Sequence, residues 1–136
     1  MHKNHQDFSL PVRVYFQDTD AGGVVYHANY LNFMERARTE WLRTHGYSNA
    51  GLMKEFGMVF VVRSFKLDYL KPALLDDLLD VTAQIKDIGR SRLTLLQEVR
   101  RGEELLTEAE VHLVCVSLES FKPVSVPEIL RKQWKN

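Results

Sequence analysis

The chain has 136 residues, with 18 basic and 18 acidic side chains and therefore no net charge. This length is typical of one domain that buries roughly two thirds of its unfolded surface. The charge balance gives no bulk attraction to nucleic acid, and no apolar run approaches the roughly 18 residues of a membrane span. Cys115 is the only cysteine, which excludes an internal disulfide framework, and the first residues, MHKNHQDF, lack the apolar core of a signal peptide. These features predict a soluble cytoplasmic protein.

The first half of the chain predicts one strand and one long helix. A polar stretch over 1–10 is expected to be loosely held, and a strand over 11–17 follows it. The next segment, 27–44, predicts a helix that stops near Gly46, a residue suited to a helix C-terminus. One face of this helix is a broad apolar arc, which indicates burial against a sheet and comprises Tyr30, Leu31, Phe33, Met34, Ala37, Trp41 and Leu42.

Arg38 lies within that apolar arc and needs a polar partner. A local pair with Glu35, three residues earlier, is the favoured explanation. A buried ion pair at a subunit contact is the alternative.

The second half predicts a short helix, four strands and a C-terminal helix. The short helix covers 50–56, and the strands cover 58–71, 78–88, 91–101 and 104–117. Strict alternation in the first of these strands places on one face Val59, Val61, Phe65, Leu67 and Tyr69. Residues 111–116 are apolar on both faces, which is typical of a central strand or of one covered by a partner subunit. The last helix is expected to share one apolar side among Ile129, Leu130 and Trp134.

This order of elements predicts an α+β fold in a single domain over 1–136. An antiparallel meander of about five strands would wrap around the one long central helix. Such a sheet leaves an edge strand and an apolar face uncovered, and pairing with a second copy would cover both. We therefore expect a homo-oligomer, either a dimer or a dimer of dimers.

The stretch between the first strand and the long helix carries the candidate chemistry. It holds Asp18, Asp20 and a pair of glycines, and His27 stands where the helix begins. Glycines let backbone approach a ligand, and the first amides of a helix carry partial positive charge without an internal partner. A carboxylate beside such amides can attack a carbonyl or activate water against it. The residues alone do not choose between the two aspartates, and an Asp-rich turn that only caps the helix is the alternative.

The run DTDAGGVVYHANYLNFMERARTEWLR resembles the signature of hot-dog-fold thioesterases of the 4-hydroxybenzoyl-CoA thioesterase family. Three further runs, FVVRSFKLDYLKPALLDDLLDV, LLTEAEVHLVCV and FKPVSVP, extend the resemblance in the same order over most of the chain. Within that family the chain is most similar to the YbgC-type acyl-CoA thioesterases, which are associated with the Tol-Pal cell-envelope system of Gram-negative bacteria. The resemblance implies a hot-dog fold and hydrolysis of acyl-CoA, or of thioesters on acyl carrier protein.

Roles for individual residues follow from the same resemblance. Asp20 matches the family's catalytic carboxylate, acting either as a nucleophile or as a general base on water. The backbone amide of His27 matches the group that polarises the thioester carbonyl, while its ring either contacts substrate or water or has no role of its own. Asp18 is then expected to hold the turn. Gly23 and Tyr26, inside the signature, are candidate substrate-binding positions.

Coenzyme A carries phosphates, so cationic side chains are expected along its path. The candidates are Arg90 and Arg92 in the GRSR turn, Lys122 in the FKPVSVP run, and Arg63, which interrupts an apolar strand face. Solvated turn arginines, and an ion pair for Arg63, are the alternatives.

The remaining reactive side chains predict no cofactor. The histidines at 2, 5, 27, 45 and 112 show no metal-ligand spacing, so no metal is expected. Cys115 is expected to be a buried small hydrophobe, and the absence of a Gly-x-Ser-x-Gly run argues against a serine hydrolase. Two competing functions remain: a hot-dog hydratase or dehydratase, and a non-catalytic module that binds an acyl carrier or an envelope partner.

Overall fold

The structure is a computed structural model that describes residues 8–135, so the expectation for residues 1–7 lies outside it. The helices are α1 (His27–Thr44), α2 (Asn49–Phe56) and α3 (Glu128–Trp134), with a single 3-10 turn, η1 (Phe16–Asp18). The strands are β1 (Ser9–Arg13), β2 (Met58–Tyr69), β3 (Leu78–Thr82), β4 (Gln84–Ile88), β5 (Arg92–Arg101) and β6 (Glu104–Ser117).

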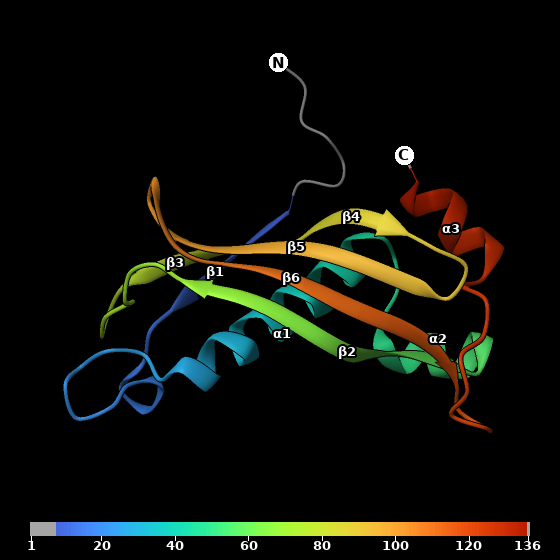
Figure 1. The fold of residues 1–136 in the computed structure, drawn as a ribbon, viewed down its shortest axis with the longest axis horizontal. Coiled ribbons are helices and arrows are strands. Elements are labelled where there is room, and N and C mark those ends of the chain that lie inside the picture. The colour runs from blue at the N-terminus through green and yellow to red at the C-terminus, as the bar shows by residue number, and fades with distance from the viewer. Residues whose placement is uncertain (1–7, 136) are drawn as a thin grey trace, which may run out of the picture.

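These strands form one antiparallel sheet with the order β1-β3-β5-β6-β2, and β4 pairs with β5 beyond the end of β3. Figure 1 shows the sheet lying over α1, with α2 and α3 at one end and the loop that precedes α1 at the other. This arrangement confirms the predicted α+β architecture of a sheet wrapped around one long helix, which is the hot-dog fold.

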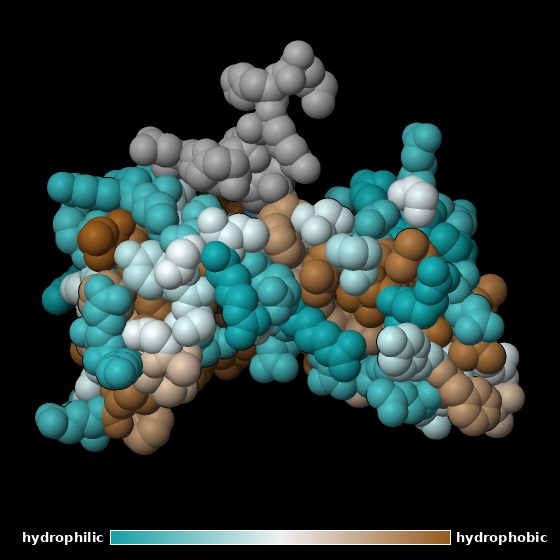
Figure 2. All heavy atoms as spheres, turned by 180° about the vertical axis from the view of Figure 1, so that it is seen from behind, coloured by the Kyte–Doolittle hydropathy of each residue, from teal (hydrophilic) through white to brown (hydrophobic). Residues whose placement is uncertain are grey.

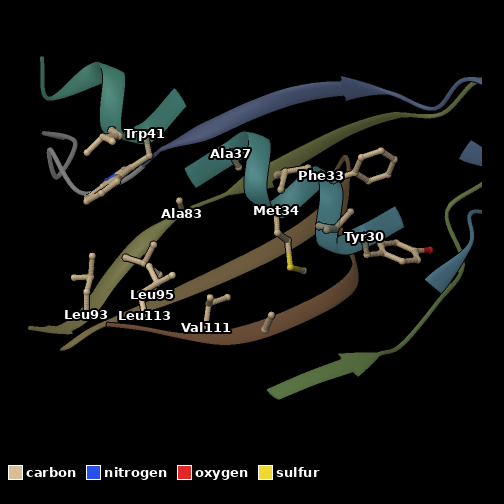
Figure 3. Close-up of a cluster of buried hydrophobic side chains, with 14 of the residues drawn as sticks. Tyr30, Phe33, Met34, Ala37, Trp41, Ala83, Leu93, Leu95, Val111 and Leu113 are labelled. Carbon is tan, nitrogen blue, oxygen red and sulfur yellow. The ribbon is translucent and has the colours of Figure 1, made fainter. Parts of the chain in front are cut away.

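The long helix has the bounds that its periodicity predicts. Six of its seven predicted apolar side chains are buried, and Leu31 is half-buried. Figure 3 shows side chains of α1 facing Leu93, Leu95, Val111 and Leu113 on the sheet. Each fully buried large side chain in this layer stabilises the fold by about 1.5–3 kcal/mol.

The first strand ends earlier than expected, at Arg13 instead of residue 17. Beyond Arg13 the chain turns, and two side-chain hydrogen bonds stabilise this turn. Asp18 Oδ2 accepts from the Tyr15 amide, and the Thr19 hydroxyl donates to the Phe16 carbonyl (both 2.8 Å). Pro11 is tolerated because β1 lies at the edge of the sheet.

The meander was predicted in part wrongly. Strands β3, β4, β5 and β6 follow one another through short turns, but β2 pairs only with β6, at the far edge of the sheet. The chain therefore crosses the end of the sheet between β2 and β3. As expected, β6 is a central strand. Val116, near its C-terminal end, is buried and bridges to Pro123 in the segment that follows the strand.

The strict alternation predicted for β2 was also wrong. A bulge between Val62 and Ser64 adds one residue, which inverts the two faces. Phe60 before the bulge and Phe65 after it both pack against the core, whereas Val61 is 39% exposed. The bulge residue is Arg63, the cation that interrupts the apolar pattern.

The strand predicted over 78–88 is interrupted at Ala83 by side-chain hydrogen bonds. The buried side-chain amide of Gln97 donates, through Nε2, to the backbone carbonyl oxygens of Thr82 (3.1 Å) and Met34 (3.0 Å). The Glu98 amide then donates to the Thr82 hydroxyl instead of to a backbone carbonyl (2.8 Å).

The partner of Arg38 is this same Gln97, which neither explanation had anticipated. Its Nη1 donates to Gln97 Oε1 (3.0 Å), and its guanidinium lies over the Phe65 ring. Burial lowers the pKa of Arg38, and the charge of Glu35 partly opposes that effect. Arg38 thus links α1 to the middle of the sheet.

Candidate active site

The loop between β1 and α1 is built as a small hairpin closed by its own polar groups. Thr19 bridges to Val25, the Asp20 amide donates to the Val24 carbonyl (2.9 Å), and the Tyr26 amide donates to the Asp18 carbonyl (3.1 Å). The two limbs therefore place Asp18 next to Tyr26, the residue before α1, and Asp20 opposite Val24.

Asp18 anchors this hairpin. Its side chain is 5% exposed, and besides the Tyr15 amide it accepts a hydrogen bond from Asn29 Nδ2 (2.6 Å) in the first turn of α1. Both carboxylate oxygens are therefore occupied by structural donors. This agrees with the expectation that Asp18 holds the turn.

Asp20 occupies the tip of the hairpin and is only half-buried. Its Oδ1 accepts hydrogen bonds from the amides of Gly22 (2.8 Å) and Val24 (3.4 Å), whereas Oδ2 takes none from residues 8–135. The Gly23 amide closes the turn on the Asp20 carbonyl (3.0 Å), and Gly23 has a φ of +80°, a left-handed conformation that favours glycine. The turn thus fixes one carboxylate oxygen and leaves the other available.

The N-terminus of α1 is not capped by a side chain. Tyr26 stands at the N-cap position, makes no side-chain capping bond and is 52% exposed. No acidic residue occupies the first turn. The amides of His27 and Ala28 therefore keep their partial positive charge for a ligand.

His27 itself is exposed and packs on the end of β2. Its ring stacks on the Tyr69 ring with centroids 4.4 Å apart and an interplanar angle of 21°. Both side chains line a shallow hollow of about 190 Å³ together with Tyr30, Lys71 and Pro72. Sequence reasoning missed Tyr69 here, because its position in an alternating strand showed only that it lay on one face.

The segment 70–77, between β2 and β3, forms the other wall of this end of the molecule. Two backbone hydrogen bonds join this segment to the hairpin. The Val25 amide donates to the Ala73 carbonyl, and the Leu75 amide donates to the Gly23 carbonyl. Large hydrophobic side chains remain exposed on both walls, namely Tyr15, Phe16, Tyr26, Leu70, Leu74, Leu75 and Leu78. Figure 2 shows exposed hydrophobic residues at both ends of the face that it presents.

The four candidate cations are not near Asp20 in the same chain. Arg63 and Arg92 line a shallow hollow of about 280 Å³ together with Lys86 and His112. Arg90 donates to the Ser125 hydroxyl (2.9 Å), and Lys122 is exposed in the segment that follows β6. Figure 1 shows this β4–β5 turn and the C-terminal segment at the end of the sheet opposite the hairpin.

An apolar hollow of about 270 Å³ lies toward that same opposite end. It is lined by the C-terminal half of α1, the start of β2 and α3, with Trp41, Phe60, Val62 and Trp134 among its walls. Arg38 and Glu35 are the charged residues on its wall.

The described chain shows neither a metal-ligand cluster nor a reactive thiol. Within residues 8–135, no three His, Cys, Asp or Glu side chains are grouped as they would be around a metal ion. Burial raises the pKa of Cys115 to about 11, so this thiol stays protonated at neutral pH, in agreement with its predicted role as a small hydrophobe. None of the helices in this range has the length and apolar character needed to cross a membrane.

A single antiparallel sheet wrapped around one long helix defines a hot-dog-fold protein. Comparisons with known proteins agree. The family model described as thioesterase superfamily matches residues 22–108. The acyl-CoA thioesterase YbgC of Haemophilus influenzae is 46% identical over 121 residues, 89% of each chain.

Two further matches span nearly the whole of both chains. The acyl-CoA thioester hydrolase YbgC of Escherichia coli O157:H7 is 46% identical over 129 residues, which is 94% of this chain and 96% of the relative. A crystal structure of a probable thioesterase from Bartonella henselae is 36% identical and has a TM-score of 0.85, covering 89% of this chain and 99% of that one. The chain belongs to the thioesterase superfamily and is a thioester hydrolase similar to YbgC.

Proposed function

We propose that the protein hydrolyses acyl-CoA to a free acid and coenzyme A, with Asp20 as the catalytic carboxylate. The names of the YbgC relatives support this substrate class. The observation that supports the mechanism is that Asp20, in the hairpin that leads into the uncapped start of α1, has Oδ1 bonded to the turn and Oδ2 without a partner among residues 8–135.

The chemistry follows from this geometry. The amide of His27 polarises the thioester carbonyl, and negative charge that develops on the carbonyl oxygen is stabilised at the positive end of the helix. In one route Asp20 Oδ2 forms a bond to the carbonyl carbon and the C–S bond breaks, which gives a mixed anhydride that water then hydrolyses. In the other route Asp20 removes a proton from the attacking water. A carboxylate and backbone amides suffice for both routes.

The test compares Asp20→Asn with Asp18→Asn. Asparagine keeps the size of Asp20 but removes the charge, so turnover should fall at least about a hundredfold, the low end of what a positioned acid or base contributes. Asp18→Asn should instead lower the free energy of unfolding by about 1–3 kcal/mol, because one buried hydrogen bond to Tyr15 or Asn29 is lost.

Release of thiol from acyl-CoA and thermal unfolding would be followed for the wild type and both variants, each with and without a chelator. Normal turnover in Asp20→Asn would remove the carboxylate mechanism, and loss of wild-type activity with the chelator would point to a metal. Hydration of an enoyl-CoA would favour the hydratase alternative.

The donor and the compartment are further parts of the proposal. Coenzyme A and acyl carrier protein present the thioester on the same phosphopantetheine arm, so both fit a site made of a carboxylate and backbone amides. A comparison of kcat/KM for one acyl group on the two donors separates them. A reduced, buried Cys115 fits the reducing cytoplasm, which cell fractionation would test.

We also infer that the working form is a homo-oligomer in which two copies share each site. Lys122 lies at the Met58 end of β2, since Met58 pairs with Ser117 and the Ser117 amide bonds to the Lys122 carbonyl. Arg90 lies at the same end of the sheet, since the next residue, Ser91, accepts a hydrogen bond from Cys115, the partner of Phe60 in β2. Tyr69, at the other end of β2, touches His27. The 12-residue strand separates these two ends by about 35–40 Å.

A single coenzyme A therefore meets both groups only if a second copy supplies one of them. Two copies that pair antiparallel along β2 would place the Met58 end of each beside the Tyr69 end of the other. The edge of β2 is suited to this pairing because it is long and carries the exposed Val61 and Val62 (both 39%). The opposite edge, β1, is short and contains Pro11, which protects it.

A further inference from the structure

Tyr69 makes two contacts with the same residue at the start of α1. Its ring lies parallel to the His27 ring, and its hydroxyl donates a hydrogen bond to the His27 backbone carbonyl (3.1 Å). The two residues are 42 positions apart in the sequence, and Tyr69 is the last residue of β2. The end of the edge strand is thereby attached directly to the first residue of the helix.

These contacts act on the first residue of α1, whereas the hydrogen bonds to Asp18 hold the helix start at Tyr26 and Asn29. No side chain caps the helix at Tyr26, and the His27 side chain is exposed. A helix terminus without a cap frays, since its first residues lack hydrogen bonds within the helix. A ring above the imidazole and a donor on the carbonyl restrict both the side chain and the backbone of His27.

Tyr69 also packs against Tyr30, on α1. Its ring meets Tyr30 edge-on at 5.3 Å, and the Tyr30 hydroxyl accepts a hydrogen bond from the Ala73 amide (2.9 Å) in the segment that borders the hairpin. Burial raises the pKa of Tyr69, so its hydroxyl remains protonated and able to donate at neutral pH. Yet 41% of Tyr69 is exposed, so packing of the core does not account for its position.

We propose that Tyr69 is a positioning residue for the thioesterase reaction, which holds His27, and with it the first amide of α1, where the thioester carbonyl must be polarised. The proposal rests on the role assigned to the His27 amide above. It deepens that role by naming the residue that keeps the helix terminus in place. Tyr69 acts through His27 and takes no part in bond making.

Two variants separate its two contacts. Tyr69→Phe keeps the ring and removes the hydroxyl, so kcat should fall about 2- to 12-fold, the value of one hydrogen bond. Tyr69→Leu also removes the ring stack and should lower kcat by a further factor of about 2 to 12. The KM for acyl-CoA should change little in Tyr69→Phe, because the ring that lines the hollow and the candidate cations are retained. The control is Tyr47→Leu, which removes a tyrosine that packs on Phe56 of α2, away from the hairpin.

The readouts are kcat and KM for one acyl-CoA, the melting temperature, and the NMR chemical shifts of the His27 ring protons. Stacking on Tyr69 shields these protons, so their signals should move downfield in Tyr69→Leu and stay near the wild-type position in Tyr47→Leu. Tyr47→Leu should lower the melting temperature while kcat stays at the wild-type value.

Two results would overturn the proposal. One is a wild-type kcat in Tyr69→Leu, and the other is a lower kcat in Tyr69→Leu without any change of the His27 signals. If Tyr69→Leu does not fold, Tyr69→Phe decides, and an unchanged kcat in that variant overturns the proposal. Failure of the proposed mechanism is a separate outcome, since it appears as normal turnover in Asp20→Asn, whereas the His27 signals report positioning without any turnover.

Discussion

Asp18 and Asp20 are chemically identical and two residues apart, yet their hydrogen bonds give them different roles. Asp18 is buried and uses both oxygens to bind the Tyr15 amide and the Asn29 side chain. Asp20 uses only Oδ1, within its own turn. A carboxylate whose oxygens are all occupied cannot approach a substrate without breaking the loop, so Asp20 is the one that suits catalysis.

The buried thiol of Cys115 should make the stability of the protein depend on pH. The folded protein holds the thiol proton more tightly than the unfolded chain, because burial raises its pKa from 9.0 to about 11. The folded state therefore binds more protons between these values, and its stability should fall as the pH rises through this window. Well below pH 9 the thiol is protonated in both states and contributes no pH dependence.

Cys115→Ala should show a smaller loss of stability across that window than the wild type. Chemical denaturation at pH 8 and at pH 10.5 measures this, and the comparison cancels lysine and tyrosine titrations common to both proteins. Equal losses in the two proteins would mean that the thiol does not titrate as its burial requires.

At the scale of elements, α3 is a short helix that buries two apolar side chains and also donates hydrogen bonds from Arg131 to the Arg90 carbonyl and from Gln133 to the His45 carbonyl. Leu130 and Trp134 are fully buried, and the Trp134 ring packs on Trp41 of α1 (5.1 Å) and Phe60 of β2 (5.7 Å). Ile129, which was expected to share this side, is 57% exposed, so that expectation was wrong. A helix of 7 residues cannot be stable alone, so its contacts with α1 and β2 must hold it.

Trp134→Ala should therefore lower the free energy of unfolding by about 3–5 kcal/mol. The adjacent Ile129→Ala is the matched control and should change it by less than about 0.5 kcal/mol, as surface substitutions do. Urea denaturation of the two variants checks both values. A small effect of Trp134→Ala would mean that α3 is not docked on the sheet in solution.

At the scale of the whole molecule, the fold leaves β2 as a long edge with exposed valines. The hairpin that carries Asp20 and the cations Arg90 and Lys122 lie toward opposite ends of this strand (Figure 1). If two copies pair along β2, the same pairing would bring the cations of one copy to the hairpin of the other and so complete the site. Val61→Lys places a charge on this edge and should shift the protein toward the monomer and reduce activity with it. Ser9→Lys, on the opposite edge strand, is the control and should leave both unchanged.

Sedimentation at micromolar concentration measures the oligomeric state, and a monomeric wild type would contradict the proposal. A mixed population tests the sharing of sites directly. Asp20→Asn and the double variant Arg90→Ala/Lys122→Ala should each be poorly active, and hybrids of the two should regain one intact site. No gain on mixing would show that each chain completes its own site.

Local features of the chain could be predicted because they depend on neighbouring residues. The bounds of α1 follow from a spacing of three to four residues, and its buried face follows from the same spacing. The role of Asp18 in the turn was expected only after the resemblance had assigned catalysis to Asp20. The catalytic choice of Asp20 came from the resemblance, since two aspartates in one loop look alike in sequence; the structure now adds the hydrogen bonds that distinguish them.

Features that join distant segments were decided only by the tertiary structure. Backbone amides and carbonyls are the same in every residue, so the sequence does not show that β2 pairs with β6 instead of β3. A bulge is an extra residue relative to a partner strand, and it becomes visible at Arg63 only when that partner is known. The contact of Tyr69 with His27 spans 42 positions and depends on how the end of β2 meets the start of α1.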